Sequence, residues 1–278
     1  MKRLKQIGAL LAIAFLIGFG LGAMIFAFID TPFAHKALTV CLYCAITAPV
    51  LIYAMMLVAK VLSHRDENDK SDKGEKTVMI DTIIFDVGRV LVNWDYESYL
   101  KRFAFGPEKT KAITAATFES PYWRQFDRGI LTPEEIVKGF CSLAPEYTEE
   151  IKEVFAHCEE TITPLPYAES WVRSLKEKGY RLYILSNYSG DLFERTKEKM
   201  PFLPYMDGTL FSYTCHLTKP EPEIYQHLIQ KFSLTPDRCV FLDDTKANVE
   251  AAEQAGIHGI HFTGYEDGVA QLKKLGVL

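Results

Sequence analysis

Hydrophobic and polar positions divide the chain into three parts. Two long runs without a charged residue, 7–29 and 37–59, lie near its start. A polar segment dense in charges of both signs follows, and it cannot form a core. Beyond it, short apolar runs alternate with helical patterns. We therefore predict an apolar hairpin at 1–62, a linker at 63–77 and a folded domain at 78–278.

Each charge-free run has the length of a membrane span. It contains 23 residues, or roughly 34 Å as a helix, against a hydrocarbon core of about 30 Å. A short turn-like segment joins the two runs, so we expect a hairpin of two transmembrane helices that contacts the lipid bilayer. A cleavable signal peptide is the alternative for the first run, but that run exceeds the usual apolar stretch of roughly 7–15 residues.

Basic residues flank the hairpin on its outer ends. Lys2, Arg3 and Lys5 precede the first run, and Lys60 and Arg65 follow the second. The turn between the runs carries one lysine and one aspartate. The positive-inside rule then places both termini and the folded domain in the cytoplasm, on an inner or plasma membrane. Neither run contains Asp, Glu, Lys, Arg or His, so a transport function is not expected.

Small residues recur every four positions in the first run. Gly18 and Gly22 form a Gly-x-x-x-Gly pattern, which allows two helices to approach closely. This face fits packing within the hairpin or a homodimer of two chains, and both alternatives stay open.

The folded part begins with an apolar, β-branched run, Thr82–Phe85, that ends on Asp86. Such a run is typical of a strand buried on both faces of a parallel sheet. Further strands with helices between them predict an α/β fold with right-handed crossovers. We expect these strands at 181–185, 210–213, 239–242 and 259–262.

A helical insertion separates the first strand from the second. No further strand is expected before Tyr180, and residues 94–163 are helical in character. One helix start is marked by Thr132 as N-cap, followed by Pro-Glu-Glu. We predict that this insertion forms a cap over the strand ends. Trp94 and Trp123 lie in or near the cap, and we expect them to pack in its core rather than to stack against a sugar.

Polar residues follow several of the predicted strands. Because the carboxyl ends of parallel strands share one edge of the sheet, we expect these side chains to converge there. A carboxylate can attack phosphorus, and neighbouring carboxylates bind Mg²⁺. A hydroxyl, an amide and an ammonium group can hold phosphoryl oxygens. The residues concerned are Asp86, Ser186, Asn187, Lys219, Asp243 and Asp244.

Four segments at these positions resemble the motifs of the haloacid dehalogenase-like (HAD) hydrolase superfamily. They read FDVGRVLV, YILSNYS, TKPEPEIY and VFLDDTKANVEAA, in that order. The resemblance covers residues 78–278 and implies a Rossmann-like parallel sheet with a helical cap after the first strand. The sequences of these motifs are most similar to those of bacterial phosphatases that act on α-glucose 1-phosphate, which also have Asp-x-Gly after the first strand.

The resemblance implies catalytic and phosphate-binding roles. Asp86 would be the nucleophile that forms an aspartyl phosphate. Ser186 would donate a hydrogen bond to the phosphoryl group together with the backbone of Asn187, and Lys219 would stabilise its charge. Arg89 fits either a contact with the substrate or a solvent-exposed turn.

It also implies a Mg²⁺ site. Asp86 and the backbone carbonyl of Gly88 would be two of its ligands. Asp244 is the preferred third ligand, with Asp243 beside it or acting through water. Asn248 replaces an aspartate that is frequent in relatives, so a supporting role is expected.

One departure from the superfamily concerns proton transfer. Most phosphatases of the superfamily have a second aspartate two residues after the nucleophile, which serves as general acid and base. This chain has Gly88 there. The proton for the leaving group must then come from water, the substrate or a cap residue. General acid–base catalysis typically contributes about 10²–10⁴-fold to a rate.

These observations predict a membrane-anchored, Mg²⁺-dependent phosphatase of a small phosphorylated metabolite, most simply a sugar phosphate. Two alternatives stay open: a catalytically weak HAD-like binding or scaffold protein, and a haloacid dehalogenase, which needs no metal. The net charge of −5 gives no indication of nucleic-acid binding. The six scattered cysteines resemble no disulfide framework and fit a reducing compartment.

Overall fold

The computed structural model describes residues 31, 36, 39–40 and 79–277. The chain divides into two units, Met1–Thr77 and Val78–Leu278, and the fold below is that of the second. Within the described residues, no helix has the length and apolar character of a membrane span. The predicted hairpin and linker lie outside the described residues, apart from the four positions named above.

A parallel sheet of five strands forms the centre of the second unit, in the order β5-β4-β1-β6-β7. Phe85 at the end of β1 pairs in register with Ile184 and Leu242 of the neighbouring strands, so the carboxyl ends of these strands lie at one edge. The predicted α/β fold with a parallel sheet is confirmed. The strands are β1 (Thr82–Phe85), β4 (Arg181–Ser186), β5 (Gly208–Phe211), β6 (Cys239–Asp243) and β7 (His258–His261).

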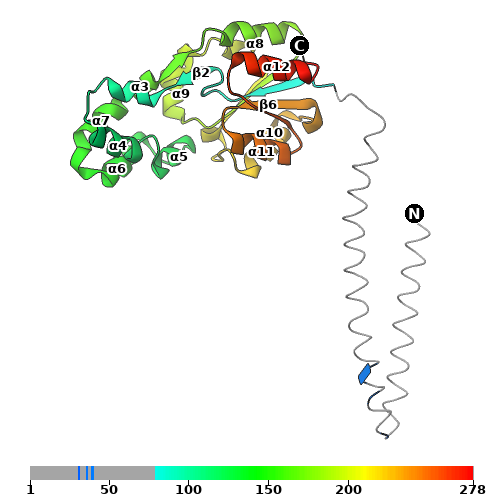
Figure 1. Ribbon diagram of the computed structural model, residues 1–278, viewed down its shortest axis with the longest axis horizontal. Helices are drawn as coiled ribbons and strands as arrows, with labels where there is room; N and C mark the ends of the chain where they lie inside the picture. The colour runs from blue at the N-terminus through cyan, green and yellow to red at the C-terminus, as the bar shows by residue number, and fades with distance from the viewer. Residues whose placement is uncertain (1–30, 32–35, 37–38, 41–78, 278) are drawn as a thin grey trace. The chain divides into compact units, whose positions relative to one another are not determined.

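Helices cover both faces of this sheet, with α8 and α12 on one face and α10 and α11 on the other (Figure 1). Alternate residues of β1 serve the two faces. Ile83 and Phe85 belong to the core that includes Trp171 of α8, while Ile84 packs with Tyr225 of α10. Burial on both sides explains why the strand is apolar throughout. The helices are α8 (Ala168–Glu177), α10 (Pro222–Phe232), α11 (Lys246–Gln254) and α12 (Tyr265–Lys274).

Glycines end two of these helices as the sequence predicts. Gly179 follows α8 with φ +90°, and Gly256 follows α11 with φ +87°; these angles favour a residue without a Cβ. Between β4 and β6 the chain also forms one α-helix and several single turns of 3₁₀ helix. They are α9 (Gly190–Thr196), η4 (Lys197–Lys199), η5 (Leu203–Tyr205), η6 (Ser212–Thr214) and η7 (Pro236–Arg238).

The helical cap lies after β1, at the other end of the unit from α8 and α12 (Figure 1). Thr132 and Glu135 form the predicted capping box, with Thr132 Oγ1 accepting from the Glu135 amide at 3.2 Å. Buried Phe126, Phe140 and Phe155 form ring contacts inside the cap. Its elements are α3 (Tyr96–Lys101), α4 (Pro107–Ala116), α5 (Pro121–Asp127), α6 (Pro133–Leu143), η2 (Pro145–Tyr147), α7 (Thr148–Ala156) and η3 (Cys158–Thr161).

A two-stranded antiparallel ribbon connects the cap to the sheet domain. It pairs β2 (Val92–Trp94) with β3 (Ile162–Pro164). The expectation of no strand before Tyr180 was therefore wrong. Each strand has three residues, too few to show an alternating pattern, and the pairing joins distant segments. The ribbon nevertheless coincides with the predicted ends of the cap at 94 and 163.

Candidate active site

The polar residues that the sequence places after strands converge at one edge of the sheet. Asp86 follows β1, Ser186 ends β4 and Asp243 ends β6. Lys219 lies in the loop before α10 and reaches the same edge. The structure thus brings the candidate site residues together, while their chemical roles stay predictions.

Asp86 is a largely buried carboxylate held by two donors. Its Oδ1 accepts a hydrogen bond from the Val87 amide at 2.7 Å and lies 2.8 Å from Nζ of Lys219. Burial raises the pKa of Asp86 to about 6, while the positive charge of Lys219 opposes the shift and the negative charge of Asp243 adds to it. A hydrogen bond from Ser186 also lowers the pKa of this group. The Asp86 carboxylate is therefore fixed by its neighbours.

Lys219 bridges two acidic groups in the interior. Its side chain is 1% exposed, and its Nζ lies 2.6 Å from Oδ2 of Asp243 besides its contact with Asp86. Burial disfavours the charged ammonium, but Asp243 and Asp86 outweigh burial and raise the pKa of Lys219. Lys219 is therefore charged at neutral pH and can balance the charge of a phosphoryl group.

Asp243 holds its neighbours in place. Besides the contact with Lys219, its Oδ1 accepts from the Thr245 amide at 2.8 Å, and both oxygens accept from Nδ2 of Asn248 at 3.0 Å. A metal bound to Asp243 would have to displace these hydrogen-bond donors. Asp243 is therefore better suited to positioning Lys219 than to binding a metal. Asn248 thus holds the Asp243 carboxylate in the structure, and its supporting role in catalysis stays a prediction.

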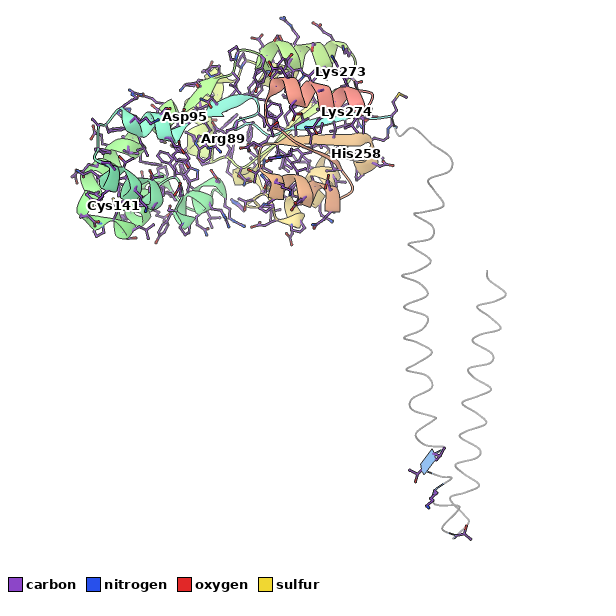
Figure 2. All side chains as sticks on the ribbon, in the orientation of Figure 1. Arg89, Asp95, Cys141, His258, Lys273 and Lys274 are labelled. Carbon is purple, nitrogen blue, oxygen red and sulfur yellow. The ribbon has the colours of Figure 1, made fainter. Side chains whose placement is uncertain are left out.

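Asp244 is more accessible than Asp243. Its side chain is 22% exposed and lies 3.7 Å from Nη1 of Arg89. Burial and then Asp243 raise the pKa of Asp244, and Arg89 opposes the shift. Arg89 stacks over the ring of Trp94 at 5.3 Å, and Figure 2 shows it between the cap and the sheet domain. Arg89 thus contacts both Trp94 and Asp244, which line the same cavity.

The carboxylates of the site fit a hard divalent cation. One oxygen from each of Asp86, Asp243 and Asp244 lies within 4.8 Å of the other two. Oxygen ligands of this kind suit Mg²⁺. Because Lys219 is held between Asp86 and Asp243, Asp86 and Asp244 are the two carboxylates left to bind it. Asp86, Asp244 and the backbone of Gly88 line the adjoining cavity. The residues present therefore fit the predicted metal.

A cavity of about 210 Å³ opens from this edge toward the cap. Nonpolar and aromatic side chains line much of its wall, and polar groups gather at the sheet edge. The cap and ribbon contribute Trp94, Trp123, Asp127 and Ile162, while the sheet domain contributes Asp86, Gly88, Arg89, Ser186, Asn187, Tyr188, Leu192, Lys219, Asp244, Thr245 and Asn248.

Three residues of this wall that the sequence singled out have a structural role. The side chain of Asn187 accepts from the Lys219 amide at 2.8 Å and donates to the Lys219 carbonyl at 3.0 Å, so it fixes the lysine loop. Trp94 and Trp123 stack with ring centroids 6.4 Å apart. They pack as expected, and they also present their rings to the cavity.

Asp127 was missed in the sequence. It ends α5 in the cap, lines the cavity, and interacts electrostatically with Asp86 and Lys219. Burial, followed by the charge of Asp86, raises its pKa to about 8. The only signal in the sequence is an aspartate before Arg-Gly, a combination that is common at solvent-exposed turns.

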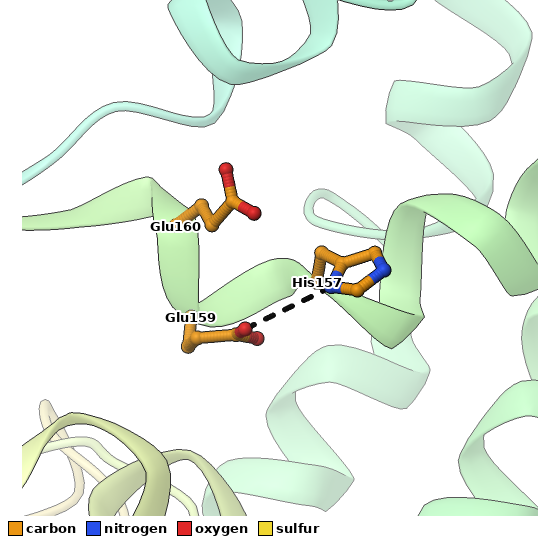
Figure 3. A group of neighbouring side chains, drawn as sticks. All are labelled: His157, Glu159 and Glu160. Carbon is orange, nitrogen blue, oxygen red and sulfur yellow. Dashed lines mark ion pairs between the residues drawn. The ribbon is translucent and has the colours of Figure 1, made fainter.

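A second group of potential metal ligands lies away from the cavity, at the end of α7 (Figure 3). It consists of His157, Glu159 and Glu160. Glu159 forms an ion pair with Arg195, and Glu160 forms one with Arg102. Arginine partners satisfy these carboxylates: Arg102 belongs to the cap and Arg195 to α9. These ion pairs explain the group without a metal.

Comparisons with known proteins agree with this geometry. A family model for haloacid dehalogenase-like hydrolases matches residues 80–256. A sesquiterpene phosphatase of Aspergillus oryzae is 26% identical over 196 residues, which are 69% of this chain and 94% of the relative. A D-ribitol-5-phosphate phosphatase of Bacteroides thetaiotaomicron is 27% identical over 189 residues, 64% of this chain and 89% of the relative. Two longer relatives are matched over 19% and 37% of their lengths.

Solved structures share the fold. A HAD family enzyme of Bacteroides thetaiotaomicron, solved as a magnesium complex, has a TM-score of 0.58 at 24% identity, covering 70% of this chain and 98% of that one. The family model covers well over half of the chain and includes the first strand, the cap and the two later strand ends that form the site. The chain therefore belongs to the haloacid dehalogenase-like hydrolases.

Proposed function

We propose that this hydrolase of phosphate monoesters is a Mg²⁺-dependent phosphatase that acts on a small phosphorylated metabolite through an aspartyl-phosphate intermediate. The observation that carries the proposal is the buried arrangement of Asp86, Lys219 and Asp243, with the ammonium 2.8 Å and 2.6 Å from the two carboxylates. A fixed carboxylate beside a fixed cation suits attack on a phosphoryl group.

Each side chain of the site has a separate role in the proposed reaction. An oxygen of Asp86 attacks phosphorus, and the bond from phosphorus to the leaving oxygen breaks. Lys219 and Ser186 hold phosphoryl oxygens while negative charge moves among them. Water then attacks the aspartyl phosphate, which releases phosphate and restores Asp86. A Mg²⁺ ion bound by Asp86, Asp244 and the Gly88 carbonyl would supply further neutralisation of phosphate charge.

For the substrate we propose a sugar or sugar-alcohol phosphate. Relatives named as phosphatases of D-ribitol 5-phosphate and of phosphorylated carbohydrates support this class. The cavity of about 210 Å³ has room for a phosphoryl group and a small leaving group. The narrower resemblance to α-glucose-1-phosphate phosphatases stays a prediction from the Asp-x-Gly spelling at Asp86.

The two alternatives are less well supported. A dehalogenase shares the fold at 18% identity and a TM-score of 0.51, but the oxygens of three carboxylates within 4.8 Å of one another favour a metal site. A scaffold protein would have no need to keep a 1%-exposed lysine between two carboxylates, an arrangement that is costly to bury.

The purified full-length protein tests the phosphatase proposal. We expect turnover of p-nitrophenyl phosphate and of members of a sugar-phosphate panel with Mg²⁺, its loss with a chelator, and its loss in Asp86→Asn. Glu134→Gln, an exposed cap carboxylate on α6, is the matched control. Absence of metal-dependent turnover on every substrate would contradict the function, and turnover that survives Asp86→Asn would contradict the mechanism.

We also propose that the charge-free runs 7–29 and 37–59 anchor the domain to the cytoplasmic face of a membrane, with the Gly18/Gly22 face available for a homodimer. Their lengths and basic flanks support the anchor. Membrane fractionation tests it: we expect the protein in the pellet after a carbonate wash and in solution after detergent. Release by carbonate would contradict the anchor.

A further inference from the structure

The cavity has a carboxyl group that the cap supplies. Among the described residues that line it, Asp86 and Asp244 lie at the sheet edge, whereas Asp127 comes from the cap. Gly88, at the position of the acid in most relatives, has no side chain to contribute. A leaving group that projects from phosphorus toward the cap would point away from the sheet edge and toward the side that carries Asp127.

We propose that Asp127 is the general acid and base of this enzyme, supplied by the cap in place of the residue missing at Gly88. This assignment rests on the proposed phosphatase function. In the first step Asp127 gives its proton to the ester oxygen as the bond from phosphorus to that oxygen breaks and an Asp86 oxygen bonds to phosphorus. In the second step the Asp127 carboxylate takes a proton from the attacking water as the bond from Asp86 to phosphorus breaks.

The position of Asp127 is fixed by contacts between the cap and the sheet domain. The Asp127 carbonyl accepts a hydrogen bond from Oγ of Ser212 at 2.5 Å. The neighbouring Arg128 donates to the His216 carbonyl at 3.0 Å and pairs with Glu221. These partners belong to the segment 212–221, which also carries Lys219. One loop therefore positions both the lysine and the cap aspartate.

Gly129 allows this close approach. It has φ +67°, and a Cβ built on it would lie 2.9 Å from Cβ of Tyr213 and 3.1 Å from its backbone. Any other residue would push the end of α5 away from the sheet domain or strain the backbone. The sequence Asp127-Arg128-Gly129 thus places a carboxyl group, anchors it, and permits the contact.

The Asp127 carboxyl has no other evident role. Among the described residues, none donates a hydrogen bond to this carboxyl group, whereas the Asp127 backbone carbonyl accepts one from Ser212. The three-carboxylate group that fits a metal comprises Asp86, Asp243 and Asp244, without Asp127. Asp127 lines the same cavity as Asp86 and Lys219, which is the position that a proton donor to the leaving group needs.

Leaving-group dependence tests the assignment. Full-length wild type and Asp127→Asn are compared with Mg²⁺ on p-nitrophenyl phosphate, whose leaving group needs no proton, and on ribitol 5-phosphate, whose leaving group does. We expect a loss of about 10²–10⁴-fold in kcat on the alkyl phosphate. We expect a change of only a few-fold on p-nitrophenyl phosphate, which also shows that the variant is folded.

A second variant separates proton transfer from packing. Apart from the chain neighbours, the heavy atom nearest to a Cβ at Gly88 is Cβ of Trp94, at 4.0 Å, so a Cβ at this position meets no clash. In the Asp127→Asn background it should restore much of the turnover of ribitol 5-phosphate. Glu134→Gln in the same cap should leave both rates unchanged.

The outcomes distinguish the two proposals. A wild type without turnover on either substrate overturns the phosphatase function and this assignment with it. An active wild type, inactivated by Asp86→Asn, supports the function. In that case, equal losses on both substrates in Asp127→Asn, an unchanged alkyl phosphate rate, or no rescue by Gly88→Asp would overturn the role of Asp127 alone.

Discussion

Removal of the buried ammonium of Lys219 tests how the site is held together. In Lys219→Met, Asp86 and Asp243 lose a cation at 2.8 Å and 2.6 Å while both stay in the interior. Their oxygens lie within 4.8 Å of each other. At an effective dielectric constant of about 20, two charges at this separation repel by about 3 kcal/mol. Removal of one partner from a buried ion pair costs about 3–5 kcal/mol, so we expect a loss of that size.

The loss should depend on pH with a definite sign. Burial already raises the pKa of Asp86 to about 6 in the folded wild type, above the unfolded value of about 3.9. Without Lys219 the folded pKa rises further. Because the folded state then holds more protons than the unfolded state, the stability of the variant falls as pH rises above about 4. The variant should therefore differ from wild type more at pH 8 than at pH 5.

Urea unfolding followed by tryptophan fluorescence measures this effect. All three tryptophans lie in the second unit, so the signal reports on that unit alone. Lys176→Met is the matched control, because the side chain of Lys176 is 36% exposed in its ion pair with Asp207 and such pairs contribute less than about 1 kcal/mol. Equal losses in the two variants at pH 8, or a larger loss for Lys219→Met at pH 5, would refute the reasoning.

Three further changes test the surroundings of the site. Asn248→Asp replaces a donor at 3.0 Å from Asp243 by a carboxylate. We expect the variant to melt at a lower temperature than wild type without Mg²⁺, and the difference in melting temperature to become smaller when Mg²⁺ is added. An equal difference with and without Mg²⁺ would contradict this. Gly129→Ala should lower stability by about 1–3 kcal/mol in urea unfolding because its Cβ would meet Tyr213 at 2.9 Å; an unchanged midpoint would contradict the close contact. Thr132→Ala removes the capping box and should cost about 1 kcal/mol in the same assay, without changing kcat.

The central sheet could be predicted because its strands are buried on both faces. The apolar runs at β1, β4 and β6 are continuous, and each ends on a polar residue, so both their positions and their common edge follow from the sequence. The edge strand β5 begins two residues before the predicted range, since Gly208 and Thr209 are only partly buried. Edge positions carry a weaker hydrophobic signal than central ones.

The pairing of groups within the site could be predicted only in part. The sequence predicts that Lys219 and Asp243 lie at the same edge. It does not predict the 2.6 Å contact through which Asp243 positions the lysine. Asp127 was missed for a related reason. Its role depends on contacts between the end of α5 and the segment 212–221, which are more than eighty residues apart along the chain. No local pattern encodes such a contact.

A proton donor on the cap makes catalysis depend on how the substrate fits beneath it. An acid at position 88 would stay beside Asp86 whatever the position of the cap, since both residues follow the same strand. In the structure, the end of α5 that carries Asp127 contacts Ser212 and His216. A substrate whose leaving group fits between the sheet edge and the rings of Trp94 and Trp123 leaves that contact intact and receives the proton. A bulkier alkyl leaving group would separate α5 from the loop, so it should lower kcat for ester cleavage even where the phosphoryl group still binds Lys219.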